Sequence, residues 1–205
     1  MDWNLKFAER AQKMESSEIG ELLKLVDSPE IISLAGGMPD PSLFPKDKIA
    51  EIAKEVIIYQ GDKSLQYCAP EGIPQLRKVL VEMAREEGIE NIATENVIVT
   101  TGSQQALLLV AQTFINPGEA IITEAPSYIG GLRAFNVFEA IFWTVPMDEN
   151  GIKVDLLEEK LKEAEEKCID IKFIYLCPNF HNPAGVTLTL ERRLKVLELS
   201  HRYNV

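Results

Sequence analysis

From about residue 95 onward the sequence alternates between short apolar runs and longer amphipathic stretches, and this alternation constrains the fold more than any other feature. Each apolar run predicts a buried strand, and each is followed by a stretch with the spacing of an amphipathic helix. Strands that alternate with helices of this length predict an α/β domain with a mainly parallel sheet. We place the strands at residues 97–100, 120–123, 140–145 and 172–177, and the helices at 103–114, 128–138, 155–167 and 189–205.

The first part of the chain predicts helices separated by loops rich in glycine and proline. Apolar residues spaced by three and four predict a helix at residues 5–26, and Pro45 suits the first turn of a second helix, because its missing N–H would be unpaired there anyway. Loops are predicted at residues 35–41 and 66–72, and a third helix at 74–88. We expect the second helix to turn five apolar residues inward, namely Ile49, Ile52, Ala53, Val56 and Ile57.

Composition limits the classes of function. The 205 residues are 46% hydrophobic and 26% charged, which is typical of a globular protein. A net charge of −11 without a basic patch argues against nucleic-acid binding, because the phosphate backbone is itself anionic. The longest purely apolar run, residues 106–111, is too short to span a membrane. Residues 1–4 lack the start of a secretory signal, so we expect a cytoplasmic protein.

The cysteines and histidines predict neither a disulfide framework nor a metal site. Cys68, Cys168 and Cys177 are odd in number and widely spaced, which favours buried, reduced thiols. His181 and His201 have no partners at the spacing of metal ligands. No metal is therefore expected.

Residues 97–107 combine a strand, a glycine and a small hydroxyl residue that opens a helix. Gly102 permits a tight turn, the first N–H groups of the helix point outward, and Ser103 adds a further donor. Together these groups can bind a phosphate. Ser103 could instead only cap its helix, and this segment alone does not separate the two interpretations.

Two further polar segments follow predicted strands. Tyr128 comes after the strand at 120–123, and Asn182 after the strand at 172–177. Because ligands bind beyond the carboxyl ends of strands in open α/β sheets, Tyr128 could stack on a flat cofactor and Asn182 could offer a donor and an acceptor. Each also has an ordinary interpretation, as a tyrosine packed under a loop and as part of an Asn-Pro turn. Three polar loops at successive strand ends favour a binding site.

Five motifs in sequence order identify a resemblance: Gly36-Gly37-Met38-Pro39-Asp40, Tyr67 with Pro70-Glu71-Gly72, Thr101-Gly102-Ser103-Gln104-Gln105-Ala106, Pro126-Ser127-Tyr128 and Asn182-Pro183-Ala184-Gly185. The chain resembles the N-terminal half of the pyridoxal-phosphate-dependent aminotransferases of class I and II. The most similar branch acts on 2-aminoadipate, kynurenine, aromatic and branched-chain amino acids.

The resemblance implies a fold and a division of the chain. The fold would be a three-layer α/β sandwich with a mainly parallel sheet, the large domain of the aspartate-aminotransferase-like fold, incomplete at the C-terminus. Residues 1–44 would form an N-terminal arm and a small-domain segment, and residues 45–205 part of the cofactor-binding large domain.

The resemblance also implies which residues bind the cofactor, pyridoxal 5'-phosphate. Ser103 and the backbone from Gly102 to Gln104 would hold its phosphate, and Tyr128 would stack on its pyridine ring. Asn182 would bond to the phenolic oxygen of the ring, and its peptide bond to Pro183 is often cis in the family, a conformation that proline tolerates.

Other implied roles concern the substrates and a second subunit. Gly37 would approach the carboxylate of the amino acid or 2-oxo acid substrate through its backbone. Tyr67 would reach the cofactor phosphate of a neighbouring subunit, which makes a homodimer part of the expectation. His181 would only line the site. From their positions on predicted helices, we expect three arginines to lie on solvated faces, namely Arg77, Arg133 and Arg192.

The residues that perform transamination in the family would follow the last residue of this chain. The reaction needs a lysine that forms a Schiff base with the cofactor and a carboxylate beside the pyridine nitrogen. We therefore assign no catalytic residue. The strand at 97–100 would lie apart from the other three, because in the family later strands lie between them. Unpaired buried backbone groups are costly, so we expect the chain alone to be marginally stable or prone to aggregation.

Four hypotheses follow from the sequence. The first is an aminotransferase of amino acid metabolism that is truncated, or split from its C-terminal half, and inactive alone. The second is a non-catalytic relic or fragment that functions only with a complementary C-terminal chain. The third is another pyridoxal-phosphate enzyme on the same scaffold, such as a carbon–sulfur lyase or a decarboxylase. The fourth, a transcriptional regulator with this scaffold, is disfavoured because no helix-turn-helix precedes the aminotransferase segment.

Overall fold

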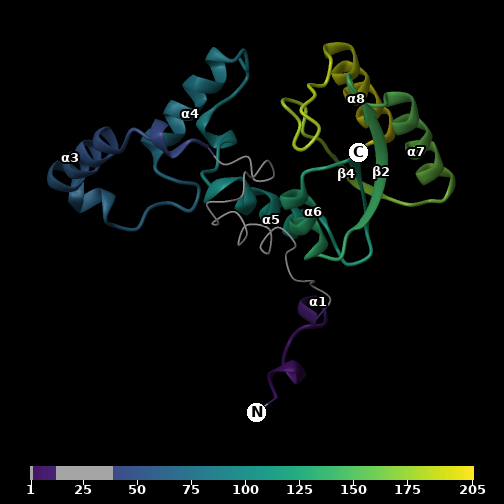
Figure 1. The fold of residues 1–205 in the computed structure, drawn as a ribbon, viewed down its shortest axis with the longest axis horizontal. Helices are drawn as coiled ribbons and strands as arrows, with labels where there is room; N and C mark the ends of the chain where they lie inside the picture. The colour runs from purple at the N-terminus through teal and green to yellow at the C-terminus, as the bar shows by residue number, and fades with distance from the viewer. Residues whose placement is uncertain (1, 13–38) are drawn as a thin grey trace, which may run out of the picture. The chain divides into compact units, whose positions relative to one another are not determined.

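The computed structural model describes residues 2–12 and 39–205 (Figure 1). The chain divides into two compact units, one formed by residues 101–205 with the start of the chain and the other by residues 15–100. At the start, short helices cover Trp3–Leu5 (η1) and Glu9–Gln12 (α1). Within the helix expected at 5–26, residues 6–8 belong to no helix, and the part after residue 12 lies outside the described residues, as do Gly37 and most of the loop expected at 35–41.

A four-stranded sheet forms the centre of the unit at residues 101–205. Its strands are β1 (Ala120–Ala125), β2 (Ile141–Asp148), β3 (Gly151–Ile152) and β4 (Ile171–Tyr175), in the spatial order β3-β2-β1-β4. β1 pairs in parallel with both β2 and β4, whereas β2 and β3 form a short antiparallel pair. The prediction of an α/β domain with a mainly parallel sheet is therefore confirmed.

Helices follow the strands as the alternation predicts. They are α5 (Gly102–Phe114), α6 (Ile129–Asn136), α7 (Val154–Glu166) and α8 (Leu190–Tyr203). α7 and α8 share one buried cluster with the sheet, and α5 and α6 share another on its opposite face (Figure 1). Two helical layers with a sheet between them make the expected three-layer sandwich.

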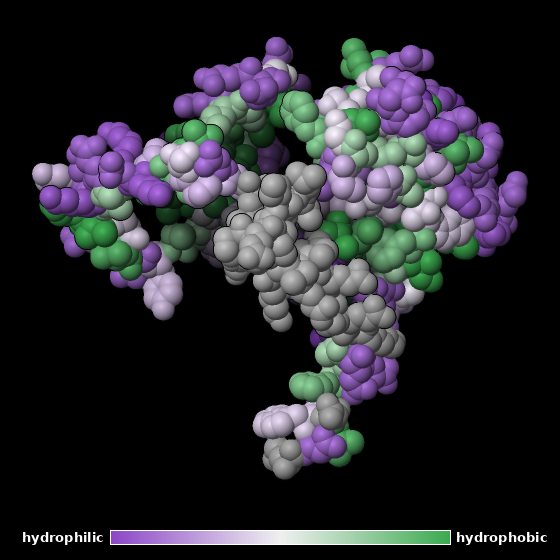
Figure 2. Space-filling model, in the orientation of Figure 1, coloured by the Kyte–Doolittle hydropathy of each residue, from purple (hydrophilic) through white to green (hydrophobic). Residues whose placement is uncertain are grey.

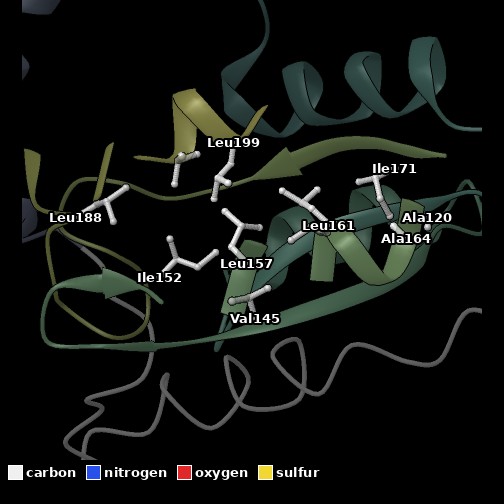
Figure 3. Close-up of a cluster of buried hydrophobic side chains, with 11 residues drawn as sticks. Ala120, Val145, Ile152, Leu157, Leu161, Ala164, Ile171, Leu188 and Leu199 are labelled. Carbon is white, nitrogen blue, oxygen red and sulfur yellow. The ribbon is translucent and has the colours of Figure 1, made fainter. Parts of the chain in front are cut away.

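β1 is buried on both faces. Successive side chains of a strand point to opposite faces, and both Ile121 and Ile122 are 0% exposed. Ile122 belongs to the cluster with α7 and α8, whereas Ile121 belongs to the cluster with α5 and α6. Figure 3 shows the first of these clusters, in which Leu157 and Leu161 of α7 lie with Val145 of β2. A run of apolar residues without alternation is what a strand in this position requires.

The cluster with α5 and α6 is built around one aromatic ring. Phe135 of α6 is 0% exposed, and its ring centroid lies 5.4 Å from that of Phe173 and 5.0 Å from that of Tyr175. Both pairs have the edge-to-face geometry that aromatic rings prefer. Because Phe173 and Tyr175 belong to β4, this ring joins α6 to the carboxyl end of that strand.

The other unit contains α3 (Lys46–Ser64) and α4 (Pro74–Glu86), which begin where the prolines predict. The inward face predicted for the first of these helices is wrong. None of its residues is buried, and Ile49, Ile52 and Ile57 are 58%, 47% and 55% exposed. Figure 2 shows apolar residues at the surface of α3. An apolar stripe is buried only where a second element covers it, and no described element buries this one.

The strand expected at 97–100 is also wrong. These residues belong to no strand, and Ile98 is 63% exposed. The N–H of Val99 instead donates to the carbonyl of Glu71, at 2.9 Å. A strand needs neighbours that satisfy its backbone groups, and the four strands of the sheet belong to the other unit.

Two features of single residues differ from expectation as well. The three cysteines are free, but Cys68 and Cys168 are exposed and Cys177 is half-buried, because all three lie in turns or loops and not in the core. The helix expected at 155–167 begins one residue earlier, at Val154, with Lys153 in the N-cap position. Among the described residues, no helix is long and apolar enough to cross a membrane.

The solvated position expected for Arg192 is wrong, because this side chain is only 19% exposed and joins α8 to the β2–β3 turn. Its guanidinium donates to both carboxylate oxygens of Asp148, at 2.7 and 2.9 Å, and to the carbonyl of Gly151 at 2.7 Å. These hydrogen bonds from the arginine lower the pKa of Asp148 to about 2. The contact holds α8 in register with the sheet.

Candidate functional site

The start of α5 is the first part of the candidate site. The helix begins at Gly102, and Thr101 is the N-cap, without a side-chain hydrogen bond to the helix. Ser103 and Gln104 lie exposed in the first turn, and a Cβ at Gly102 would meet no atom of the described residues within 4 Å. Ser103 is thus inside the helix and not its cap. The first turn of a helix carries N–H donors and the positive end of the helix dipole, which favour a bound anion.

The start of α6 lies next to the start of α5. Nε2 of Gln104 donates to the carbonyl oxygen of Gly130, at 3.1 Å. Tyr128 is the N-cap residue of α6, and a Cβ at Gly130 would come within 2.5 Å of its ring. A Cβ at Gly131 would likewise come within 2.9 Å of the ring of Tyr175. Two adjacent glycines therefore make room for two tyrosine rings at this helix start.

Tyr175 ends β4 next to this helix start. Burial raises the pKa of its hydroxyl to about 12, with smaller contributions from Cys177, Tyr128 and Glu124. The hydroxyl therefore keeps its proton at neutral pH and remains a hydrogen-bond donor.

Asn182 lies in the loop that follows β4, and its side chain is exposed. The peptide bond between Asn182 and Pro183 is cis, as the resemblance implies. A second cis bond, between Ala125 and Pro126, precedes Tyr128 and was not predicted. Both predicted polar loops thus contain a cis proline.

Two buried titratable side chains join the Asn182 loop to β1. Glu124 and His181 are each 2% exposed, and Nε2 of His181 lies 3.2 Å from Oε2 of Glu124. The same oxygen accepts a hydrogen bond from the N–H of Cys177, at 2.8 Å. Nε2 of His181 has no hydrogen-bond partner among the described residues, so its contact with Glu124 is electrostatic. Burial raises the pKa of Glu124, against the opposing effects of Cys177 and His181.

Sequence reasoning assigned His181 to the lining of the site and overlooked Glu124. A signal was present, because Glu124 is a charged residue next to the apolar run of β1, and buried carboxylates need a partner. The signal does not identify the partner, which lies far along the chain.

These contacts place three of the sequence-predicted segments along one edge of the sheet. The first turn of α5, Tyr128 and the Asn182 loop lie beyond or beside the carboxyl ends of β1 and β4. Tyr67 belongs to the other unit and is 99% exposed. Gly37 lies outside the described residues. Ligands of open α/β sheets bind at this kind of edge.

A sequence profile for the family described as "Aminotransferase class I and II" matches residues 29–205. The chain belongs to this family. The matched residues extend through both units to the last helix, so the family assignment covers the whole candidate site.

Individual aminotransferases agree with this assignment. The chain is 46% identical over its whole length to aromatic-amino-acid aminotransferase 1 of Thermococcus litoralis. It is 43% identical, with a TM-score of 0.91 over 99% of the chain, to the kynurenine aminotransferase of Pyrococcus horikoshii in complex with PMP. It is 38% identical, with a TM-score of 0.87, to the α-aminoadipate aminotransferase of Thermus thermophilus complexed with N-(5'-phosphopyridoxyl)-L-leucine.

The chain spans about half the length of the aminotransferases that it matches. It covers 49% of the Thermococcus litoralis protein and 50% of the Pyrococcus horikoshii chain. The resemblance to the N-terminal half of the family is therefore confirmed. The related structures from Pyrococcus horikoshii and Thermus thermophilus themselves contain PMP and N-(5'-phosphopyridoxyl)-L-leucine, respectively.

Proposed function

We propose that this chain binds pyridoxal 5'-phosphate for amino-group transfer between an amino acid and a 2-oxo acid, and that it needs a complementary C-terminal polypeptide to do so. The observation that supports this most is the shared edge of β1 and β4. The first turn of α5, Tyr128 and the Asn182 loop meet there, joined by the Gln104 and His181 contacts.

The residues at this edge fit the cofactor. Ser103 and the first turn of α5 offer donors for a phosphate. The hydroxyl of Ser127 is buried without a hydrogen-bond partner among the described residues, beside a half-buried Tyr128 whose ring can stack on a flat heterocycle. Asn182 offers an exposed amide at the third position. When bound, the pyridine ring would supply the electron sink that amino-group transfer needs.

Four finer features belong to the same proposal. The boundary near residue 44 would separate an arm and small-domain segment from the cofactor-binding domain. Gly37 would contact the substrate carboxylate. Tyr67, whose side chain is 99% exposed, would reach the cofactor of a second subunit in a homodimer. The chain would act in the cytoplasm.

Cofactor binding is tested with a matched pair of variants on α5. In the chain complemented with a C-terminal polypeptide, the dissociation constants of pyridoxal 5'-phosphate and of pyridoxal, which lacks the phosphate, are measured by fluorescence. The wild type should prefer the phosphate ester, and Ser103→Ala should lose about 10-fold of that preference, because a hydrogen bond to a charged group contributes about 1.5 kcal/mol or more. Gln112→Ala, an exposed position on the same helix, should keep it. Equal affinity for both ligands would refute the phosphate site.

Dependence on a second polypeptide is tested by complementation. The chain is mixed with the C-terminal half of the Thermococcus litoralis relative, which is 46% identical over the matched half. Borohydride reduction followed by mass spectrometry should then give a pyridoxyl adduct on the C-terminal polypeptide and none on the 205-residue chain alone. An adduct on the chain alone would contradict the absence of a catalytic lysine. No cofactor binding in either sample would make the chain a non-catalytic relic.

A further inference from the structure

Residues 182–185 form the exposed tip of a loop whose two sides are joined by hydrogen bonds. The N–H of Leu188 donates to the carbonyl of Pro178 at 2.9 Å, and the N–H of His181 donates to the carbonyl of Val186 at 2.8 Å. Beyond this last pair the side chains of the tip are exposed, so apolar packing does not fix its position. Hydrogen bonds and the residues at its base must do so.

His181 is where bonds from the tip converge. The N–H of Gly185 donates to its carbonyl at 2.6 Å, and the N–H of Ala184 donates to Nδ1 of its ring at 3.2 Å. The residue before it, Phe180, has a φ of 47° and is 85% exposed. Such a backbone conformation is uncommon for a large side chain. It accompanies a reversal in which Phe180 faces solvent and His181 faces the interior.

The ring of His181 connects the tip to β1. Because Nδ1 accepts the N–H of Ala184, the proton of the neutral ring belongs on Nε2, the nitrogen that lies 3.2 Å from Oε2 of Glu124. Glu124 is held in turn by the N–H of Cys177. The side chains of His181 and Glu124 are each 1% exposed, so solvent screens their interaction little.

We propose that His181 is a positioning residue, whose ring holds the tip that carries Asn182 against the carboxyl end of β1. One ring nitrogen fixes the shape of the tip through Ala184, and the other fixes its place on the sheet through Glu124. The inference rests on the proposed function in one respect, which is the identity of the group that His181 positions. That group is the Asn182 amide, which would face the cofactor. His181 itself need not touch the cofactor.

Amide hydrogen exchange without cofactor tests the first contact. The exchange of the Ala184 N–H is measured in the full chain, relative to core amides of β1, in three variants. His181→Leu should accelerate it by about 10-fold, because the acceptor is lost. His181→Asn places an amide oxygen where Nδ1 lies and should stay within about 3-fold of wild type. His181→Gln places its amide near Nε2 and should exchange as fast as the leucine variant. Wild-type exchange in all three variants would overturn the proposal.

A double-mutant cycle tests the second contact. Glu124→Leu should also accelerate exchange at Ala184, because the imidazole ring can then turn its Nδ1 away from the Ala184 N–H, a freedom that the shorter asparagine side chain of His181→Asn lacks. It should add nothing in the His181→Leu background, because it acts through the ring. Accelerations that multiply in the double variant would mean that Glu124 and His181 act independently, and the proposal would fail. Normalising to β1 amides removes a general loss of stability from the comparison.

Cofactor affinity then separates this inference from the proposed function. In the complemented protein, His181→Asn should weaken pyridoxal 5'-phosphate binding about 5-fold or more although Ala184 stays protected, since the tip has its shape but not its anchor. A residue with a merely structural role in the turn would leave the affinity of this variant unchanged, and that result would overturn the proposal. If wild type binds no cofactor, the proposed function fails, and the exchange results still decide whether His181 holds the tip.

Discussion

Replacing Gly131 by alanine tests how tightly the aromatic cluster holds the candidate site. Gly131 is buried in the first turn of α6, and a methyl group there would come within 2.9 Å of the ring of Tyr175. That ring cannot easily move aside, because it lies edge to face against Phe135 at 5.0 Å. The side chain and the methyl group would therefore compete for the same space.

The magnitude follows from two opposing contributions. Alanine stabilises a helix by roughly 0.5–1 kcal/mol relative to glycine, because the unfolded chain has less conformational freedom to lose. Forcing an extra methyl group into a filled core costs about 1–3 kcal/mol. The steric cost should win, so we expect Gly131→Ala to destabilise the fold by about 1 kcal/mol. For a chain of this length such a loss lowers Tm by roughly 2–4 °C.

The adjacent glycine provides a matched control. In Gly130→Ala the methyl group would come within 2.5 Å of the ring of Tyr128, which is only half-buried and can turn toward solvent. We expect unchanged or higher stability in this variant. Urea unfolding followed by circular dichroism gives both midpoints, and Tyr175→Leu should abolish the cost of Gly131→Ala. A Gly131→Ala chain as stable as wild type would refute the steric argument.

Three further perturbations test the core and the titrating groups. Leu157→Ala should cost about 2–5 kcal/mol in urea unfolding, because the side chain is 0% exposed, and Leu156→Ala, which removes a partly buried side chain, should cost less. The pKa of Asp148 is lowered to about 2 from 3.8, so the stability of wild type relative to Asp148→Asn should be constant at neutral pH and shrink as pH falls from 4 toward 2. The pKa of Tyr175 is raised to about 12 from 10.0, so this hydroxyl ionises at lower pH in the unfolded chain than in the folded one. Wild type should therefore lose stability relative to Tyr175→Phe as pH rises above 10, and urea midpoints across that range measure the loss.

Strands of the sheet could be predicted from the sequence where their own apolar composition leads to burial. β1, β2 and β4 were located to within a few residues, because each is rich in apolar side chains and is followed by a helical pattern. The strand at 97–100 and the inward face of α3 failed for a shared reason. An apolar pattern identifies the face whose burial would stabilise the fold, but it does not show whether a neighbouring element covers that face.

The candidate site also contains residues that could be predicted from the sequence and a contact that could not. Gly102, Tyr128 and Asn182 could be found because each follows a predicted strand or opens a predicted helix. The contact between Glu124 and His181 could not, because it joins the ends of two strands whose adjacency appears only in the folded sheet. Sequence order places β2 next after β1, whereas β4 is the strand that brings His181 to it.

The central position of β1 has a consequence for cooperativity. Ile121 and Ile122, neighbours in one strand, belong to different clusters, so neither helical layer can leave the sheet without exposing a side of β1. Loss of either layer therefore removes the support on which the other is packed. The two layers should melt in one all-or-none transition, with equal calorimetric and van't Hoff enthalpies, and not as separate subdomains.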